Sequence, residues 1–247
     1  MSESIESFSL SAIGKKFREG SLKAVALTQH CIDQHEPSLN AYREWTPEQA
    51  LRQAQQADKA FANAQDAGAL QGIPISVKDL YGVNDTQTFA GSPAPMPPPW
   101  QSEGKMIKGL RASHAVFSGK THTVEFAFGG LGVNSHWGTP RNPWDADRHR
   151  VPGGSSSGAG VSLCEGTALV ALGSDTAGSV RIPASMTGNV GLKTSYGRWP
   201  VSGIFPLSPT LDTAGILTKS VADAVTAFSA IDPHQRSYGP RLTHEVA

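Results

Sequence analysis

The sequence of 247 residues predicts an α/β fold, formed as a single domain over residues 1–247 around a mixed or parallel β-sheet. Two observations predict it. Segments with helical periodicity alternate with short apolar runs rich in β-branched residues, which is the pattern of a sheet covered by helices. Many of the 26 glycines and 17 prolines cluster with serine in short stretches, where they indicate tight turns inside a globular chain.

The region from about residue 9 to residue 68 is predicted to be helical. Ser21 is a candidate N-cap for one helix, because an apolar stripe at helical spacing follows it. Thr46 is the candidate cap of the next helix, since Pro47 suits the first helical position. Gly68 is the expected stop of that helix.

Three short runs are predicted to be strands of the sheet: residues 73–78, 115–120 and 168–173. The first alternates and is rich in β-branched residues, and the third is wholly apolar, as expected of a strand buried on both faces. Residues 91–100 are predicted to form a loop, because their prolines can neither donate to a ladder nor continue a helix.

Further helices are expected at residues 122–128, at residues 159–164 and after Ser179. A last helix is expected to begin at Ser220, which forms a capping-box pattern with Asp223, and to reach about residue 231.

Charge and composition narrow the class of protein. The 21 basic and 21 acidic residues cancel, so the basic stripe of a nucleic-acid-binding protein is missing and no direct nucleic-acid partner is expected. No apolar run approaches the ~20 residues of a membrane span. The N-terminal segment lacks the apolar stretch of a signal peptide, and two cysteines, Cys31 and Cys164, suit a reducing compartment. We therefore expect a cytoplasmic protein with no membrane partner.

The first of three segments that could carry chemistry is the Gly/Ser run at 153–158. It could be a flexible loop or an anion cradle at a helix N-terminus, although the lysine of a phosphate-binding P-loop does not follow it. It also fits the GxSxG nucleophile elbow, with Ser156 as nucleophile. The elbow would have to recruit His234 or His244 from a polar tail, so this hypothesis is the weaker one.

The second segment, residues 173–184, leaves the apolar run, turns through small residues and enters a predicted helix. Successive N–H groups at such a turn can converge on one oxygen, as an oxyanion hole requires. The alternative is an ordinary turn in which Ser179 caps the helix. The third segment is Lys78-Asp79 at the end of a predicted strand. It is either a surface ion pair or a buried lysine, whose pKa desolvation would lower until the amine can accept a proton.

Together these segments resemble the amidase signature family over roughly residues 20 to 230. Five stretches look like that family's blocks in their usual order: GIPISVKDL (72–80), FAFGGLGVNSHWGTPRNPW (126–144), PGGSSSGAGVSL (152–163), GSDTAGSVRIPA (173–184) and GNVGLKTSYGR (188–198). The resemblance implies the amidase signature fold, a mixed twisted β-sheet covered by helices on both faces, with the catalytic blocks inside residues 72–198.

The resemblance also implies a mechanism. Ser179 corresponds to the nucleophile, Ser155 to a serine held by a cis peptide that relays protons, and Lys78 to the base. The spacing of the two serines agrees with the family. The remaining implied residues are the oxyanion donors Thr176, Ala177 and Gly178, together with Ser179, and the supporting residues Ser156, Asp175 and Arg181.

The implied activity is hydrolysis of a carboxylic amide C–N bond in a small molecule to acid and ammonia or amine, through an acyl-enzyme and without a cofactor. Two alternatives stay open: a glutaminase-type subunit of a tRNA-dependent amidotransferase, and a truncated, catalytically silent member of the family. No metal is expected, because the histidines are irregularly spaced and no paired cysteine pattern accompanies them. These histidines are His114, His122, His136 and His149.

The sequence departs from the family pattern in two ways. Ala177 stands where the family usually has glycine, and a positive φ there would cost about 1 kcal/mol. Family members also continue past the helix expected at Ser220, so the sheet is expected to be incomplete at its C-terminal end. A fragment, a natural short form and a chain completed by a homodimer partner or a second chain are all compatible with this expectation.

Overall fold

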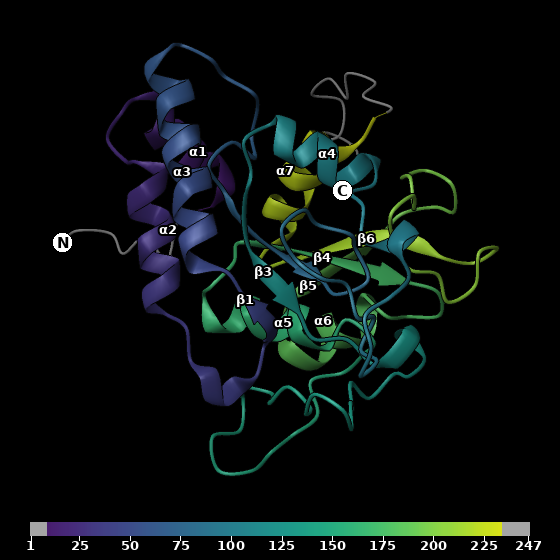
Figure 1. The fold of residues 1–247 in the computed structure, drawn as a ribbon. Helices are drawn as coiled ribbons and strands as arrows, with labels where there is room; N and C mark the ends of the chain where they lie inside the picture. The colour runs from purple at the N-terminus through teal and green to yellow at the C-terminus, as the bar shows by residue number, and fades with distance from the viewer. Residues whose placement is uncertain (1–8, 234–247) are drawn as a thin grey trace, which may run out of the picture.

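The computed structural model describes residues 9–233, and its centre is a six-stranded mixed β-sheet with strand order β1-β3-β2-β4-β6-β5 (Figure 1). β2 runs parallel to β3 and to β4, whereas β1, β5 and β6 pair antiparallel to their neighbours. The strands are β1 (Tyr42–Trp45), β2 (Pro74–Lys78), β3 (Val116–Thr121), β4 (Val170–Asp175), β5 (Val190–Lys193) and β6 (Thr213–Thr218). The predicted α/β class with a mixed sheet is confirmed.

The three predicted strands are β2, β3 and β4, each within one or two residues of its expected start. Every residue of these strands is buried, since helices cover both faces of the sheet. Ile75 and Val77 of β2 are fully inaccessible and join the main hydrophobic core. Because β2 and β4 lie in the middle of the sheet, side chains at their ends are held by packing on both sides.

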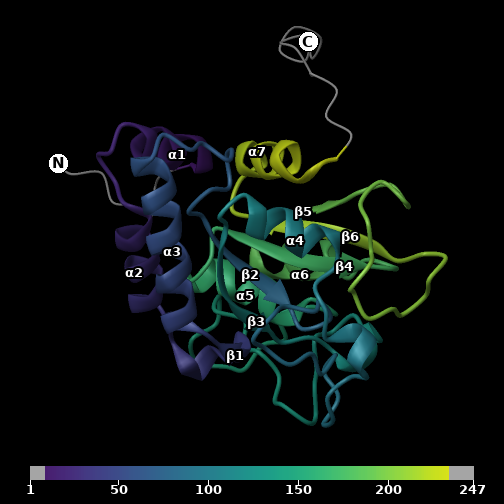
Figure 2. The same ribbon diagram turned by 45° about the horizontal axis from the view of Figure 1, so that its top comes forward.

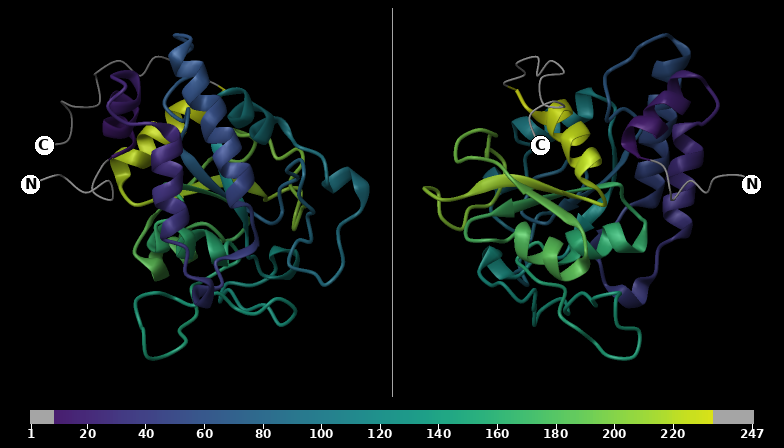
Figure 3. Two further views of the ribbon diagram at one scale, coloured as in Figure 1. Left: turned by 60° about the vertical axis from the view of Figure 1, so that its left-hand side comes forward. Right: turned by 180° about the vertical axis from the view of Figure 1, so that it is seen from behind.

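Helices lie on both faces of the sheet, as Figures 2 and 3 show. α5 (Ser157–Glu165) and α6 (Arg181–Thr187) cover one face, and α4 (Lys105–Ala112) and α7 (Val221–Ile231) cover the other. Beside the sheet stand α1 (Leu10–Arg18), α2 (Ala24–Asp33) and α3 (Pro47–Ala62), which pack as a group. None of these helices is long and apolar enough to cross a membrane within the described residues.

The predicted cap at Ser21 is wrong. α2 begins at Ala24, and the carboxylate of Asp58 on α3 accepts the N–H groups of Ala24 and Val25 at 2.8 and 3.1 Å. Ser21 instead donates its hydroxyl to the carbonyl of Lys16. A carboxylate from a neighbouring helix therefore supplies what the local sequence pattern assigned to a nearby serine.

α3 begins at Pro47 after Thr46, as predicted, but the Thr46 hydroxyl donates to Ser118 O and makes no capping bond. The helix ends at Ala62, well before the expected stop at Gly68.

The helix expected at residues 122–128 is also wrong. The structure has only a 3-10 turn at Glu125–Ala127, where Phe126 and Ala127 take positive φ values of 50° and 61°. Such values end a right-handed helix. The loop at 91–100 is confirmed except for a 3-10 turn at Pro98–Trp100.

The last predicted helix, α7, is confirmed together with its cap: the Ser220 hydroxyl accepts the N–H of Asp223 at 3.1 Å. α5 and α6 likewise occupy the two positions predicted for helices after the Gly/Ser run and after Ser179.

Candidate active site

The amine of Lys78 lies at the carboxyl end of β2 and contacts two serine hydroxyls. Its Nζ is 2.7 Å from Ser155 Oγ and 3.0 Å from Ser174 Oγ. Ser155 precedes α5, and Ser174 stands near the end of the neighbouring strand β4. Lys78 and Ser155 are fully buried. The structure therefore joins two of the predicted site residues, Lys78 and Ser155, and adds a second hydroxyl, that of Ser174, which was not predicted from the sequence.

Burial lowers the pKa of Lys78 to about 7, because the ammonium form loses its hydration, while the charges of Asp175 and Asp212 oppose this shift. Near neutral pH a large fraction of the side chain is then the free amine, which can accept a proton. The alternative of a surface Lys78–Asp79 pair is wrong. Asp79 is buried and pairs instead with Lys120 at 2.9 Å and Arg43 at 2.8 Å.

The Gly/Ser run is a buried, hydrogen-bonded segment and not a flexible exposed loop. The Gly154–Ser155 peptide is cis. Gly154 donates its N–H to Gly130 O at 2.8 Å, and Ser155 O accepts the N–H of Val124 at 3.1 Å. Gly158 approaches the neighbouring chain so closely that an added Cβ would stand 2.0 Å from Ala41 O. These contacts fix the backbone on both sides of the Ser155 hydroxyl.

The turn that carries Ser179 is built around the carboxylate of Asp175. Its oxygens accept the N–H groups of Gly178 at 2.8 Å and Val180 at 3.1 Å, and both form hydrogen bonds with the Arg181 guanidinium at 3.0 Å. Burial alone would raise the pKa of Asp175, but Arg181 and the backbone donors outweigh it and hold that pKa below its usual range. Asp175 thus bonds both to Arg181 and to the backbone of the turn that carries Ser179.

Gly178 takes a φ of 127°, a conformation that favours glycine, whereas Ala177 is not among the described residues with positive φ. The strain considered for Ala177 therefore does not arise. The N–H of Gly178 is donated to Asp175 and is engaged in this structure. Of the predicted oxyanion donors, this leaves the N–H groups of Thr176, Ala177 and Ser179.

Ser179 lies at the edge of the buried region, with 8% of its surface exposed. Its carbonyl accepts the N–H of Ser156 at 3.2 Å, which joins the turn to the segment that carries Ser155. The hydrogen bonds of residues 9–233 do not include one between the hydroxyls of Ser179 and Ser155. Such bonds are often long in the absence of substrate and tighten only when it binds.

The nucleophile-elbow hypothesis finds no geometry in its favour. An elbow serine projects its hydroxyl toward the substrate, but Ser156 is fully buried and its Oγ donates to Ser174 O at 3.4 Å. His234 and His244 lie outside the described residues. Burial lowers the pKa of His122 to about 4, and its ring lies 3.1 Å from Asn40 Oδ1, so it is a neutral interior residue.

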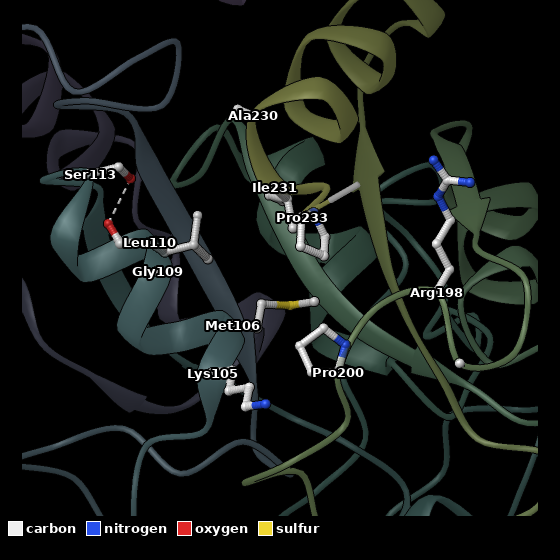
Figure 4. A pocket seen from close by; sticks show the side chains of 11 residues that line it. Lys105, Met106, Gly109, Leu110, Ser113, Arg198, Pro200, Ala230, Ile231 and Pro233 are labelled. Carbon is white, nitrogen blue, oxygen red and sulfur yellow. Dashed lines mark hydrogen bonds between the residues drawn. The ribbon is translucent and has the colours of Figure 1, made fainter. Parts of the chain in front are cut away.

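Two cavities differ in their position relative to the candidate site, and one of them reaches it. One, of about 240 Å³, reaches Ser174 and has an apolar wall formed by Trp100, Phe205 and Leu207, with Asp212 beside them. The other, of about 450 Å³, lies between α4 and the end of α7 (Figure 4). None of the predicted site residues lines the second cavity. Within residues 9–233 no three side chains of the metal-ligating types gather into one cluster.

Comparison with known proteins gives concordant results. The family model Amidase matches residues 23–243. The chain is 57% identical to 2-amino-5-chloromuconic acid deaminase of Comamonas testosteroni, an alignment that covers 91% of this chain and 49% of the relative. It is 37% identical to a glutamyl-tRNA(Gln) amidotransferase subunit of Carboxydothermus hydrogenoformans, over 93% of this chain and 48% of the relative.

Solved structures show the same likeness. A crystal structure of an amidase superposes with a TM-score of 0.85 at 36% identity, over 91% of this chain and 51% of its own. The native peptide amidase of Stenotrophomonas maltophilia superposes with a TM-score of 0.82 at 29% identity, over 98% of this chain and 50% of its own. The chain spans about half the length of the curated relatives that it matches.

Proposed function

The chain belongs to the amidase family, and on that premise we propose that it hydrolyses a carboxylic amide C–N bond through an acyl-enzyme on Ser179. The observation that carries the proposal is the buried amine of Lys78, 2.7 Å from Ser155 Oγ and with a pKa lowered to about 7. A serine hydroxyl becomes a competent nucleophile only when a base takes its proton, and Lys78 can supply that base without a histidine.

In the proposed reaction Ser179 Oγ attacks the carbonyl carbon while its proton passes to Ser155 Oγ, and the proton of Ser155 passes to neutral Lys78. The C–N bond then breaks as the same relay returns a proton to the departing nitrogen, which leaves as ammonia or amine. Water, activated by the relay, attacks the acyl-enzyme, releases the acid and restores Ser179. Each proton moves between atoms of the relay, so no cofactor is needed.

The oxyanion of the tetrahedral intermediate would be held by the N–H groups of Thr176, Ala177 and Ser179. Preorganised donors of this kind are worth about 2.7–4 kcal/mol each when removed. Gly178 would join them only if its N–H left Asp175. The support roles follow from the contacts: Asp175 and Arg181 hold the turn in place.

Similarity favours a small-molecule substrate. The Comamonas relative at 57% identity is a deaminase of an amino-substituted muconic acid, so release of ammonia from an amino-substituted unsaturated dicarboxylic acid is the second candidate reaction. A glutaminase-type subunit of a tRNA-dependent amidotransferase is favoured less, because identity to the Carboxydothermus relative of that kind is 37%. The same proposal includes a homodimer partner or a second chain that completes the sheet. It also includes a cytoplasmic location, because Cys31 and Cys164 form no disulfide bond, as is usual in a reducing compartment.

The test is covalent labelling of the purified chain with a fluorophosphonate, with the modified residue identified by mass spectrometry. We expect labelling at Ser179 that falls sharply in Lys78→Ala and persists in Ser156→Ala. A folded chain that takes no label contradicts the proposal for this chain alone. Labelled protein would then be assayed for ammonia release from simple amides, from glutamine and from amino-substituted dicarboxylic acids. Under the glutaminase alternative, ammonia release from glutamine should require added partner subunits.

A further inference from the structure

A second carboxylate, that of Asp212, also bonds to the turn of the candidate site. Its Oδ1 accepts the hydroxyl of Thr176 at 2.5 Å. Its oxygens also accept the N–H groups of Leu207 at 2.9 Å and Ser208 at 3.0 Å. Asp212 is 9% exposed and lies just before β6, far along the chain from the motif that contains Thr176.

Asp212 therefore stabilises its own loop and also bonds to the turn that carries Ser179. The backbone donors of Leu207 and Ser208 close the loop before β6, and the Thr176 hydroxyl connects that loop to the first residue of the turn that carries Ser179. Just beyond Asp212, the Thr213 hydroxyl donates to Asp175 O at 2.7 Å. Asp212, which precedes β6, and Thr213, the first residue of β6, thus bond to the successive residues Thr176 and Asp175.

Asp212 also belongs to the charged surroundings of Lys78. Two carboxylates act on that amine, Asp175 from the end of β4 and Asp212 from the loop before β6, and both favour its protonated form. The other charged groups close to Lys78 in the chain and in the sheet are Asp79 on its own segment and Lys120 on β3, which pair with each other at 2.9 Å. Arg43, from β1, pairs with the same Asp79.

We propose that Asp212 is a positioning residue of this site: it orients the Thr176–Ser179 turn through the Thr176 hydroxyl, and it acts on Lys78 from the cavity that it lines together with Ser174, whose Oγ is 3.0 Å from the Lys78 amine. The inference rests on the function proposed above, since it assigns Asp212 a part in the same Ser–Ser–Lys site. Asp212 touches none of the reacting atoms, so both effects are exerted through Thr176 and Lys78. The same carboxylate would couple the geometry of the turn to the protonation of the base.

The charge is tested by NMR titration of the full chain labelled with ¹³C-lysine, with the Lys78 Cε signal assigned by its loss in Lys78→Met. In Asp212→Asn we expect the Lys78 midpoint to fall by about 0.5–1 pH unit, less than the 1–3 units typical of a direct ion-pair partner. Asp58→Asn is the matched control, because Asp58 likewise caps backbone N–H groups but is not among the charges that act on Lys78. Equal Lys78 titration midpoints in wild type and Asp212→Asn overturn the proposed effect of the Asp212 charge on Lys78.

The positioning is tested by the rate of fluorophosphonate labelling in Thr176→Val and Thr176→Ser. Valine keeps the Asp212 charge but removes the hydroxyl, so labelling should slow about ten- to a hundredfold with the Lys78 midpoint unchanged, and serine should restore the rate. Labelling of Thr176→Val at the wild-type rate overturns the positioning role. The comparison of Thr176→Val with Thr176→Ser still tests the positioning role if Asp212→Asn does not fold.

The two proposals fail differently. Absence of label on wild-type Ser179 contradicts the proposed function, whereas the NMR titration needs no reactivity and still tests the coupling between Asp212 and Lys78.

Discussion

The amine of Lys78 lies 2.7 Å from the hydroxyl of Ser155, and neither side chain is exposed to solvent. Burial removes the water that would stabilise an ammonium ion, and the pKa of Lys78 falls to about 7. The neighbouring serine is thereby supplied with a proton acceptor whose protonation changes within the physiological pH range.

The rate of Ser179 labelling should rise with pH and reach half its plateau near pH 7. Lys78 is protonated below its pKa and neutral above it, so the base is present only on the alkaline side. The measurement is the second-order labelling rate from pH 5 to 9, corrected for hydrolysis of the reagent. A rate independent of pH across this range contradicts Lys78 as the base. In Lys78→Met the rate should be about 10²–10⁴-fold lower and should lose this inflection.

Substitution of the three serines should separate their roles. Ser179→Ala should take no label, Ser155→Ala should label slowly because the relay is broken, and Ser156→Ala should keep most of the wild-type rate. The reason is position: Ser155 contacts the Lys78 amine, whereas Ser156 donates only to a backbone carbonyl. Circular dichroism should show for each variant that it is folded. Loss of labelling in Ser156→Ala with retention in Ser179→Ala would revive the elbow hypothesis.

Arg181→Ala should make the fold more sensitive to acid. Arg181 helps to hold the pKa of Asp175 below its usual range, so this carboxylate stabilises the fold above its unfolded pKa and loses that contribution as pH falls through its lower folded pKa. Without Arg181 the folded pKa rises, and acid unfolding should begin at higher pH. Because half of the Arg181 side chain is exposed, we expect a loss at neutral pH of only about 1 kcal/mol.

The measurement is near-ultraviolet circular dichroism during acid titration. Lys15→Ala is the control, since Lys15 pairs with Glu19 at 3.7 Å on the surface. Superimposable titration curves for Arg181→Ala and wild type would contradict the role given to Arg181.

Asp79→Asn should be strongly destabilising. Asp79 is the shared partner of Lys120 and Arg43, and Lys120 is 1% exposed, so the substitution leaves a buried cation without its counter-charge. Breaking a buried pair from one side typically costs about 3–5 kcal/mol of unfolding free energy. Urea denaturation gives the value. Asp79→Asn combined with Lys120→Met should recover part of it, and a double variant no more stable than the single one argues against an unpaired charge as the cause.

Much of the central fold is predictable from the sequence because it is encoded locally. The runs that predict β2, β3 and β4 are short and local: residues 73–78 alternate and are rich in β-branched residues, and residues 168–173 are wholly apolar. β6 contains a glycine and two terminal threonines, and β1 and β5 are four residues long, so these strands carry too little pattern to be found. Whether these three segments form strands depends on their pairing with neighbouring strands and not on their own sequence pattern.

The residues of the candidate site likewise fall into two groups: those that a local motif indicates and those that only the folded chain brings together. Lys78, Ser155 and Ser179 stand in recognisable blocks, whereas Ser174 and Asp212 emerge only when strands far apart in the chain meet. Ser174 lies inside one of those blocks, near the carboxyl end of β4, the strand that pairs with β2. Asp212 carries no comparable signal. The mistaken cap at Ser21 has the same origin, since the true partner, Asp58, comes from another helix.

The two contacts of the Lys78 amine span 77 and 96 residues of chain. No short segment contains both members of either contact, so a peptide excised around any one motif would carry the residues without their chemistry. Closing loops of that size is entropically costly and becomes favourable only once the surrounding strands have paired. The proposed reactivity of Ser179 would therefore depend on cooperative folding, and selection for activity in such a chain would also be selection for a correctly closed sheet.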